Sequence, residues 1–175
     1  MGKKRIFIAV PITKYLQEEI FKWEKKYKNL PVRWLSGKNI HITLIPPWYE
    51  SDINSVVSKL KKVEGEPLDI EFNKVSYGYA PKRPSLIRAE GHAPDKLINL
   101  KSELEKIFPE HKSGYKDWLM HITIARFNPE TFSSFPVKSL DEKVAWRDKI
   151  NSFVLMESHL SRSGADYEVL KEFKL

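Results

Sequence analysis

The alternation of hydrophobic and polar positions predicts a chain of short strands separated by three helices. We expect strands at about 4–10, 39–45, 68–77, 85–89, 119–125, 152–160 and 167–173. Helices are expected after a Thr13 cap, from about Asp52 and from about Pro94, because hydrophobic residues recur there every three or four positions. Pro46 and Pro47 should end the second strand, and a phase slip within 68–77 indicates a bulge.

The order of these elements repeats. A strand–helix–strand–helix–strand run is followed by a link at about Gly78–Pro84 and then by a second run of strand, helix and strands. This order suggests two related halves, each containing helices and strands. With 175 residues, the chain is long enough for one domain with two small lobes, so we expect a single domain over residues 1–175.

Composition narrows the possible chemistry. The chain has no cysteine, which excludes thiol nucleophiles, cysteine-ligated zinc and disulfides and suits a reducing, cytoplasmic location. No segment approaches the roughly 18 apolar residues that span a membrane. The net charge of +7 favours anionic partners such as phosphates, although many proteins are basic for solubility alone.

One tetrapeptide pattern occurs twice, as His41-Ile42-Thr43-Leu44 and as His121-Ile122-Thr123-Ile124, each inside an expected strand. Since side chains alternate along a strand, each motif presents an imidazole beside a hydroxyl and turns two aliphatic side chains the other way. A lone histidine in a strand is more often a structural residue. Two such motifs, in similar places of two similar halves, could instead face each other across a groove.

Two facing imidazoles suit the cleavage of a cyclic phosphodiester. Attack by water requires a base, departure of the sugar oxygen requires an acid, and histidine can serve as either at neutral pH. The threonine hydroxyls can donate hydrogen bonds to the phosphate oxygens, where charge accumulates in the transition state. This chemistry requires neither a metal nor a cofactor.

The sequence resembles the two-histidine phosphoesterases, specifically the RNA 2′,3′-cyclic phosphodiesterases, historically called 2′-5′ RNA ligases. The resemblance rests on the two His-x-Thr-x motifs and extends to Arg5–Ala9, Arg33-Trp34, Glu157-Ser158 and Tyr167–Leu170. It implies an α+β fold of two pseudo-symmetric lobes, each an antiparallel sheet with helices outside, and an active cleft between the sheets. The chain departs from the family pattern at Ile45–Trp48 and at Met120.

The resemblance also implies roles for individual residues. His41 would be the general acid, His121 the general base, and Thr43 and Thr123 the phosphate-binding hydroxyls, with a 2′-phosphate as product. The two histidines could exchange roles, since sequence alone cannot order them. Arg126 follows the second motif as an arginine does in the family, but strict alternation would turn it away from His121, so this role requires a bulge or the end of the strand.

Three aromatic residues near the motifs, Trp48, Tyr79 and Trp118, could stack on a terminal base, or they could be ordinary core or rim residues. We expect RNA or oligonucleotide ends that carry a 2′,3′-cyclic phosphate as partners, no membrane partner, and a monomeric enzyme. Reverse 2′-5′ ligation is a second activity that the resemblance implies. Two other readings stay open. The chain could be a non-catalytic RNA-binding or nucleotide-binding module, or the histidines could ligate a metal, although neither motif contains a carboxylate.

Overall fold

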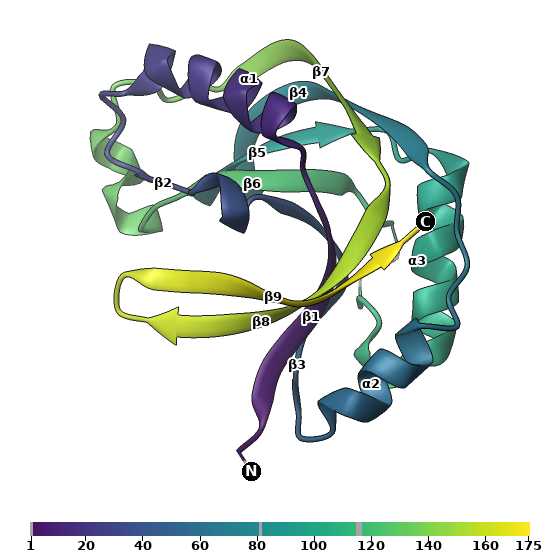
Figure 1. Ribbon diagram of the computed structural model, residues 1–175. Coiled ribbons are helices and arrows are strands. Elements are labelled where there is room, and N and C mark those ends of the chain that lie inside the picture. Colours follow the sequence, from purple (N-terminus) through teal and green to yellow (C-terminus); the bar gives the residue numbers. More distant parts are fainter. Residues whose placement is uncertain (1, 81, 115–116) are drawn as a thin grey trace.

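The computed structural model describes residues 2–80, 82–114 and 117–175 and has an α+β fold built on two antiparallel sheets (Figure 1). The first sheet contains, in spatial order, β3 (His41–Glu50), β1 (Lys4–Pro11), β8 (Ser152–Ser161) and β9 (Gly164–Lys174). The second sheet contains β2 (Arg33–Trp34), β6 (Met120–Arg126), β5 (Arg83–Gly91), β4 (Leu68–Ala80) and β7 (Asp141–Ile150). The expected class of two antiparallel lobes is confirmed.

In the described residues, three helices and four short 3-10 segments connect the strands. The helices are α1 (Lys14–Glu24), α2 (Ile53–Leu60) and α3 (Asp95–Ile107), and the 3-10 segments are η1 (Lys25–Tyr27), η2 (Gly37–Asn39), η3 (Pro109–His111) and η4 (Pro129–Ser134). Figure 1 shows α1 against β7 and, on the other side, α2 beside α3. Among the described residues, no helix has the length and apolar character that crossing a membrane requires.

The predicted helix start at Thr13 is confirmed. The Thr13 hydroxyl accepts a hydrogen bond from the Leu16 backbone N–H, and α1 then buries Leu16, Ile20 and Trp23. Buried Asp148 of β7 holds the cap, since its carboxylate accepts hydrogen bonds from both the backbone N–H and the hydroxyl of Thr13. The start of the helix is therefore tied to the edge of the second sheet.

The two sheets do not correspond to two successive halves of the chain. The first sheet pairs β1 and β3 with β8 and β9 from the other end of the sequence. The expected link at about Gly78–Pro84 is instead the tip of a hairpin, in which Gly78 pairs with Leu86 and Tyr79 with Pro84. Residues 78–80 pair with residues 83–86 within one sheet, and residue 81 lies outside the described residues, so the described part of this segment belongs to the second sheet alone.

The expected end of the second strand at Pro46 is wrong, because β3 continues through both prolines to Glu50. It can do so because β3 is an edge strand that pairs only with β1, and the register shifts between Ile6 and Ile8 where the prolines lie opposite. Strands β2 and β7 were not expected, and both lie at edges of the second sheet. In β7, Asp148 occupies one of the alternating buried positions, which breaks the hydrophobic pattern.

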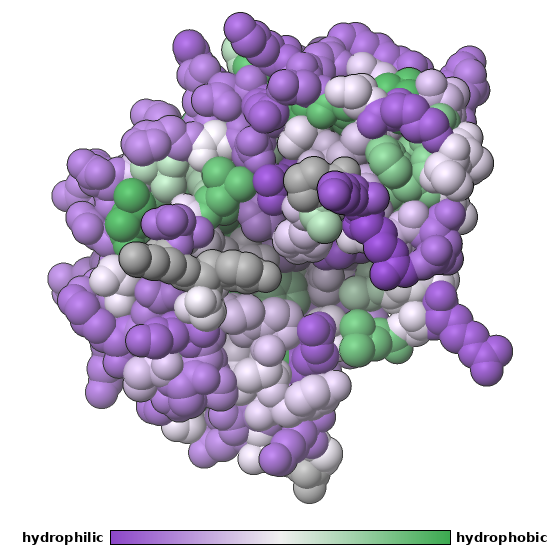
Figure 2. Space-filling model, turned by 180° about the vertical axis from the view of Figure 1, so that it is seen from behind, coloured by the Kyte–Doolittle hydropathy of each residue, from purple (hydrophilic) through white to green (hydrophobic). Residues whose placement is uncertain are grey.

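A hydrophobic core lies against both sheets and takes the aliphatic residues of each motif. Ile42, Leu44, Ile122 and Ile124 are all 1 % exposed or less. A smaller apolar cluster of Phe7, Ala9, Val154 and Met156 lies on the opposite face of the first sheet, beside Tyr167. The surface seen from behind is largely hydrophilic, with hydrophobic residues in small separate groups (Figure 2). The structure thus leaves the polar side chains of the two motifs on the face away from the main core.

Candidate active site

Both repeated motifs line one cleft of about 340 Å³. His41 and Thr43 come from β3 of the first sheet, and His121 and Thr123 come from β6 of the second. Aliphatic residues between them face the core, as the alternation of a strand requires. The structure therefore brings together the four side chains that the sequence analysis singled out.

A β-bulge follows the threonine of each motif. On β3, Thr43 pairs with Ala9 but Ile45 pairs with Ile8, so Leu44 is the extra residue. On β6, Thr123 pairs with Arg88 but Ala125 pairs with Ile87, so Ile124 is the extra residue. The bulge reverses the alternation beyond Ile124, and Arg126 lines the cleft with His121. This is the irregularity that the expected position of Arg126 requires.

The two imidazoles are held in the same way. Nδ1 of His41 lies 2.9 Å from the backbone carbonyl of Asn39, and Nδ1 of His121 lies 2.9 Å from that of Leu119. Because a carbonyl only accepts, each Nδ1 carries a hydrogen and donates it. In the neutral ring, Nε2 then remains as the acceptor that can exchange a proton with a ligand.

His41 has an aromatic surrounding. Its ring centre lies 4.9 Å from that of Phe7 and 5.2 Å from that of Tyr167. The pKa of His41 is lowered to about 4, chiefly by burial; the hydrogen bond to the Asn39 carbonyl opposes this effect, and the positive charges of Arg126 and His121 add to it. His41 is therefore neutral at pH 7.

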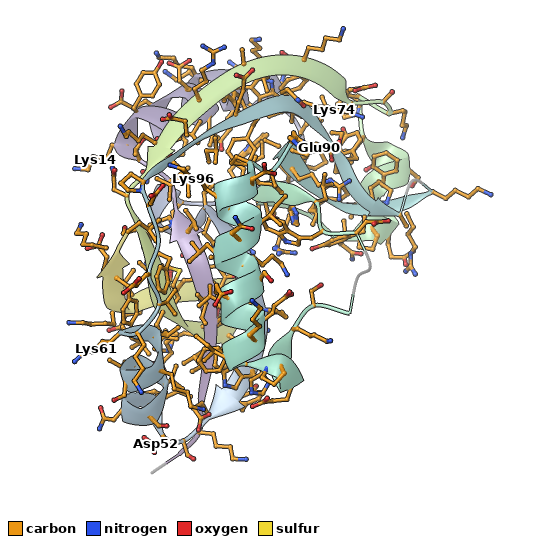
Figure 3. All side chains as sticks on the ribbon, turned by 90° about the vertical axis from the view of Figure 1, so that its right-hand side faces the viewer. Lys14, Asp52, Lys61, Lys74, Glu90 and Lys96 are labelled. Carbon is orange, nitrogen blue, oxygen red and sulfur yellow. The ribbon has the colours of Figure 1, made fainter. Side chains whose placement is uncertain are left out.

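His121 has charged neighbours. Burial lowers its pKa, the Leu119 carbonyl raises it, and Arg88 and Arg126 lower it while Glu90 raises it. The Glu90 carboxylate lies 3.0 Å from Nε of Arg88 and 3.8 Å from Nζ of Lys74 (Figure 3). Arg88 and Glu90 lie on β5, which is beside β6, and Lys74 lies on β4 beyond it. Among the described residues, a carboxylate thus opposes the effect of burial on His121 but not on His41.

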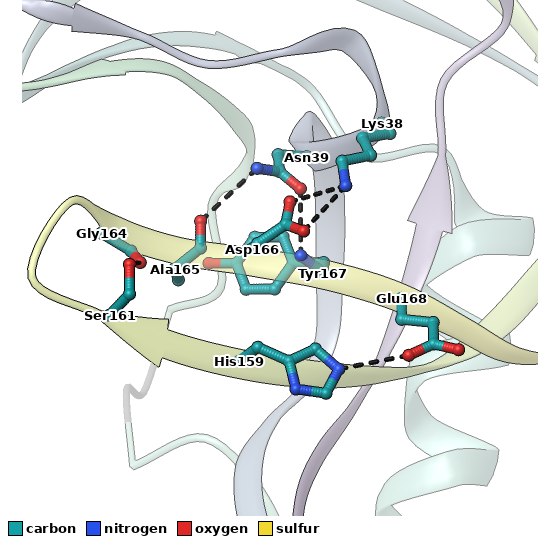
Figure 4. Close-up of polar contacts among 9 residues, drawn as sticks. All are labelled: Lys38, Asn39, His159, Ser161, Gly164, Ala165, Asp166, Tyr167 and Glu168. Carbon is teal, nitrogen blue, oxygen red and sulfur yellow. Dashed lines mark hydrogen bonds and ion pairs between the residues drawn. The ribbon is translucent and has the colours of Figure 1, made fainter.

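The segment before β3 is clamped to β9 (Figure 4). The side-chain amide of Asn39 donates to the Ala165 carbonyl at 3.4 Å, and its oxygen accepts from the Tyr167 backbone N–H at 3.1 Å. Nearby, Lys38 forms an ion pair with Asp166 at 2.8 Å. Asn39 is buried, and its own carbonyl orients His41, so one residue connects the β8–β9 hairpin to the imidazole.

Of the three expected stacking residues, two line the cleft. Tyr79 is 57 % exposed, and Trp118 has the Lys101 ammonium 5.4 Å from its ring centre. Trp48 lies outside the cleft, contrary to expectation. It pairs with Ile6 on the core-facing side of β3, and its ring stacks on His111 at 4.7 Å, so it is a core residue.

The sequence analysis assigned no role to several other residues of the cleft, namely Arg5, Phe7, Asn39, Ser113 and Tyr167. The sequence contained an indication for two of them. Arg5 and Phe7 alternate with core residues along the first strand, so both were expected on the face away from the core. A larger and more open depression of about 760 Å³ is lined by residues such as Thr13, Asp69 and His92. This depression is a weaker candidate for a two-histidine site, because His92 is the one histidine among its described lining residues. Its Asp148 side chain already accepts the hydrogen bonds of Thr13 at the start of α1.

The only group of three potential metal-binding side chains among the described residues is Glu157, His159 and Glu168, which is separate from the cleft. Lys4 lies 2.5 Å from the Glu157 carboxylate, so this acidic side chain already has a cationic partner. His41 and His121 belong to no such group within the described ranges.

Comparison with known proteins agrees with this geometry. Residues 16–162 match the model of the 2′-5′ RNA ligase superfamily. RNA 2′,3′-cyclic phosphodiesterases of Methanocaldococcus jannaschii and Aquifex aeolicus are each 25% identical, covering 97% and 98% of this chain and 99% and 97% of theirs. The fold resembles that of E. coli LigT, with a TM-score of 0.77 at 20% identity, covering 99% of this chain and 98% of LigT. The chain belongs to the 2′-5′ RNA ligase superfamily of two-histidine phosphoesterases.

Proposed function

We propose that this protein is an RNA 2′,3′-cyclic phosphodiesterase that hydrolyses terminal cyclic phosphates to 2′-phosphates. One observation carries the proposal: two histidines and two threonine hydroxyls line the same cleft, and in the described part of the chain each histidine uses Nδ1, not Nε2, for its hydrogen bond. The names of the relatives from M. jannaschii and A. aeolicus support this substrate class. Because one chain supplies both histidines, the proposed enzyme acts as a monomer, and the absence of cysteine agrees with a cytoplasmic location.

The proposed reaction is an acid–base hydrolysis. One imidazole accepts a proton from water as the water oxygen bonds to phosphorus, and the other donates a proton to the 3′ oxygen as the P–O3′ bond breaks. The products are a 2′-phosphate and a 3′ hydroxyl. Thr43 and Thr123 donate hydrogen bonds to the non-bridging oxygens, and the Arg126 guanidinium offsets their negative charge. These groups are already present in the cleft, so the proposal includes no metal.

The surroundings of the two rings favour His41 as the base and His121 as the acid. His41 has no carboxylate within ion-pair distance among the described residues, and its pKa of about 4 leaves it neutral and able to accept a proton. Burial lowers the pKa of His121 as well, but Glu90 opposes this effect, so we take that ring as the proton donor once an anionic phosphate is bound. This assignment reverses the one implied by the family resemblance. Histidine ¹⁵N NMR with 2′-AMP bound would decide between them, since we expect His121 to protonate at the higher pH.

The proposed activity is tested with an oligonucleotide ending in a 2′,3′-cyclic phosphate, in excess chelator, with ³¹P NMR identifying the product. We expect a 2′-phosphate from the wild-type protein and a loss of at least ~100-fold for His41→Ala and for His121→Ala, the usual contribution of a general acid or base. His92→Ala is the matched control, because His92 is exposed and outside the cleft.

Three outcomes would contradict the proposal. Wild-type rates in both cleft variants would remove the histidines from the reaction. Activity that disappears with the chelator would favour metal ligation by the two imidazoles. A 3′-phosphate product would place the protein in a different branch of cyclic phosphodiesterases.

A further inference from the structure

The cleft contains more unpaired positive charge than a single phosphate requires. Of the seven arginines in the chain, Arg83, Arg88 and Arg147 form ion pairs with glutamates. Arg33 and Arg162 do not line the cleft. The remaining two, Arg5 from β1 and Arg126 from β6, line it from opposite sheets, and neither has a carboxylate within ion-pair distance in the described part of the chain. Arg126 follows the second motif and suits the reacting phosphate, which leaves Arg5 without a partner of opposite charge.

Arg5 is held in place by a neutral group. Its Nη1 donates to the hydroxyl of Ser158 at 2.7 Å, and Ser158 is itself buried on β8. The neighbouring Lys4 turns to the other side and pairs with Glu157, as the alternation of β1 requires. Since a guanidinium has five N–H donors and Ser158 takes one, Arg5 is a fixed cation with donors left for an anion.

The position of Arg5 relative to the histidines sets the distance to that anion. Phe7, on the same face of β1, contacts the His41 ring at 4.9 Å. Arg5 lies two residues further from His41 along the strand, a step of about 7 Å. One nucleotide spans such a distance, so an anion at Arg5 would belong to the same nucleotide as the reacting cyclic phosphate, at its other end.

We propose that Arg5 forms a second phosphate subsite, which binds the phosphate on the 5′ side of the terminal nucleotide. The inference rests on the proposed function and defines its substrate class more narrowly: RNA ends or 5′-phosphorylated cyclic nucleotides are preferred over cyclic nucleotides that lack a 5′-phosphate. Arg5 is a specificity residue in this arrangement, because it contacts the substrate away from the bonds that break.

The experiment compares adenosine 2′,3′-cyclic phosphate with the same nucleotide carrying a 5′-phosphate. For each protein, the ratio of kcat/KM values for the two substrates is measured. We expect the wild-type ratio to favour the 5′-phosphorylated substrate by about 10- to 100-fold, as for a charge-assisted hydrogen bond. Arg5→Ala should bring the ratio close to one, and Arg5→Lys, which keeps the charge but loses the planar fork, should give an intermediate ratio. Arg162→Ala, an exposed arginine outside the cleft, should leave the ratio at its wild-type value.

The outcomes separate this inference from the proposed function. If the wild-type protein hydrolyses neither substrate, the proposed function fails. If it hydrolyses both with a ratio near one, or if Arg5→Ala lowers both rates equally, the 5′-phosphate subsite is refuted while the hydrolase stands. Should Arg5→Ala unfold, inhibition of the wild-type protein by adenosine 5′-monophosphate and by adenosine gives the same comparison, and equal inhibition constants would overturn the inference.

Discussion

The low pKa of His41 makes a prediction about stability that is independent of catalysis. A folded-state pKa of about 4, against roughly 6.5 in the unfolded chain, means that between these pH values the unfolded chain binds more protons. The contribution of His41 is therefore fully present above about pH 6.5 and is lost as the pH falls toward 4. Because a tenfold change in a proton equilibrium is worth about 1.4 kcal/mol, the full loss amounts to about 3 kcal/mol.

The perturbation is His41→Asn, which removes the titrating ring and keeps an amide that can donate to the Asn39 carbonyl. Urea unfolding at pH 7.5 and at pH 4.5 gives the free energy of unfolding of each protein. We expect the wild-type protein to lose about 2 to 3 kcal/mol more than the variant over this interval. The comparison between proteins is essential, because Glu24, with its pKa raised to about 7 by burial, changes stability in the opposite direction.

His92→Asn is the control, since His92 is exposed and its curve should parallel that of the wild-type protein. Parallel curves for the wild-type protein and His41→Asn between pH 4.5 and 7.5 would refute the reasoning. That result would mean that the folded protein does not hold the ring in its neutral form.

Further predictions concern the other groups of the site. Thr43→Val and Thr123→Val should each lower kcat by about 10- to 1,000-fold without lowering the Tm, because only a transition-state donor is lost; unchanged kcat would exclude both hydroxyls from the reaction. Arg126→Ala should lower kcat/KM by at least ~10-fold, with partial recovery in Arg126→Lys, and an unaltered value would place its charge outside the substrate site. Asn39→Ala should lower the free energy of unfolding by about 1 to 3 kcal/mol, since two partly buried hydrogen bonds to β9 are lost, and should shift the ¹⁵N resonances of His41 but not those of His121. The control is Leu119→Ala, at the matching position before the second motif, which should leave the His41 resonances unchanged. If Asn39→Ala also left them unchanged, the hydrogen bonds between Asn39 and β9 would have no influence on the His41 ring.

The part of the site that could be predicted from the sequence is the part that depends on local alternation. Each motif places His and Thr two residues apart, so a strand puts both on one face whatever its partners are. The position of Arg126 depends on a bulge at Ile124, and nothing in the local sequence distinguishes Ile124 from an ordinary core residue. Trp48 was misplaced for a related reason, because its orientation follows from the continuation of β3 past two prolines that an edge strand tolerates.

The pairing of distant strands could not be predicted in this way. Hydrophobic periodicity indicates that β8 is a strand but carries no information about β1 as its partner, and the order of elements suggested two successive halves instead. Arg5 and Tyr167 enter the site through this pairing, since both lie on the first sheet together with Ser158. Strand β7 was missed because buried Asp148 serves the α1 cap, an interaction that can be recognised only once the fold is known.

The central place of β1, between β3 and β8, has a consequence for synthesis on the ribosome. When β1 and β3 leave the exit tunnel of the ribosome, β8 and β9, which complete their sheet, have not been translated, because they begin more than a hundred residues later in the sequence. Asn39 likewise awaits Ala165 and Tyr167 before it can fix the first imidazole. A nascent chain therefore has no assembled pair of cleft histidines, and under the proposed function we expect hydrolase activity only after β9 has been translated.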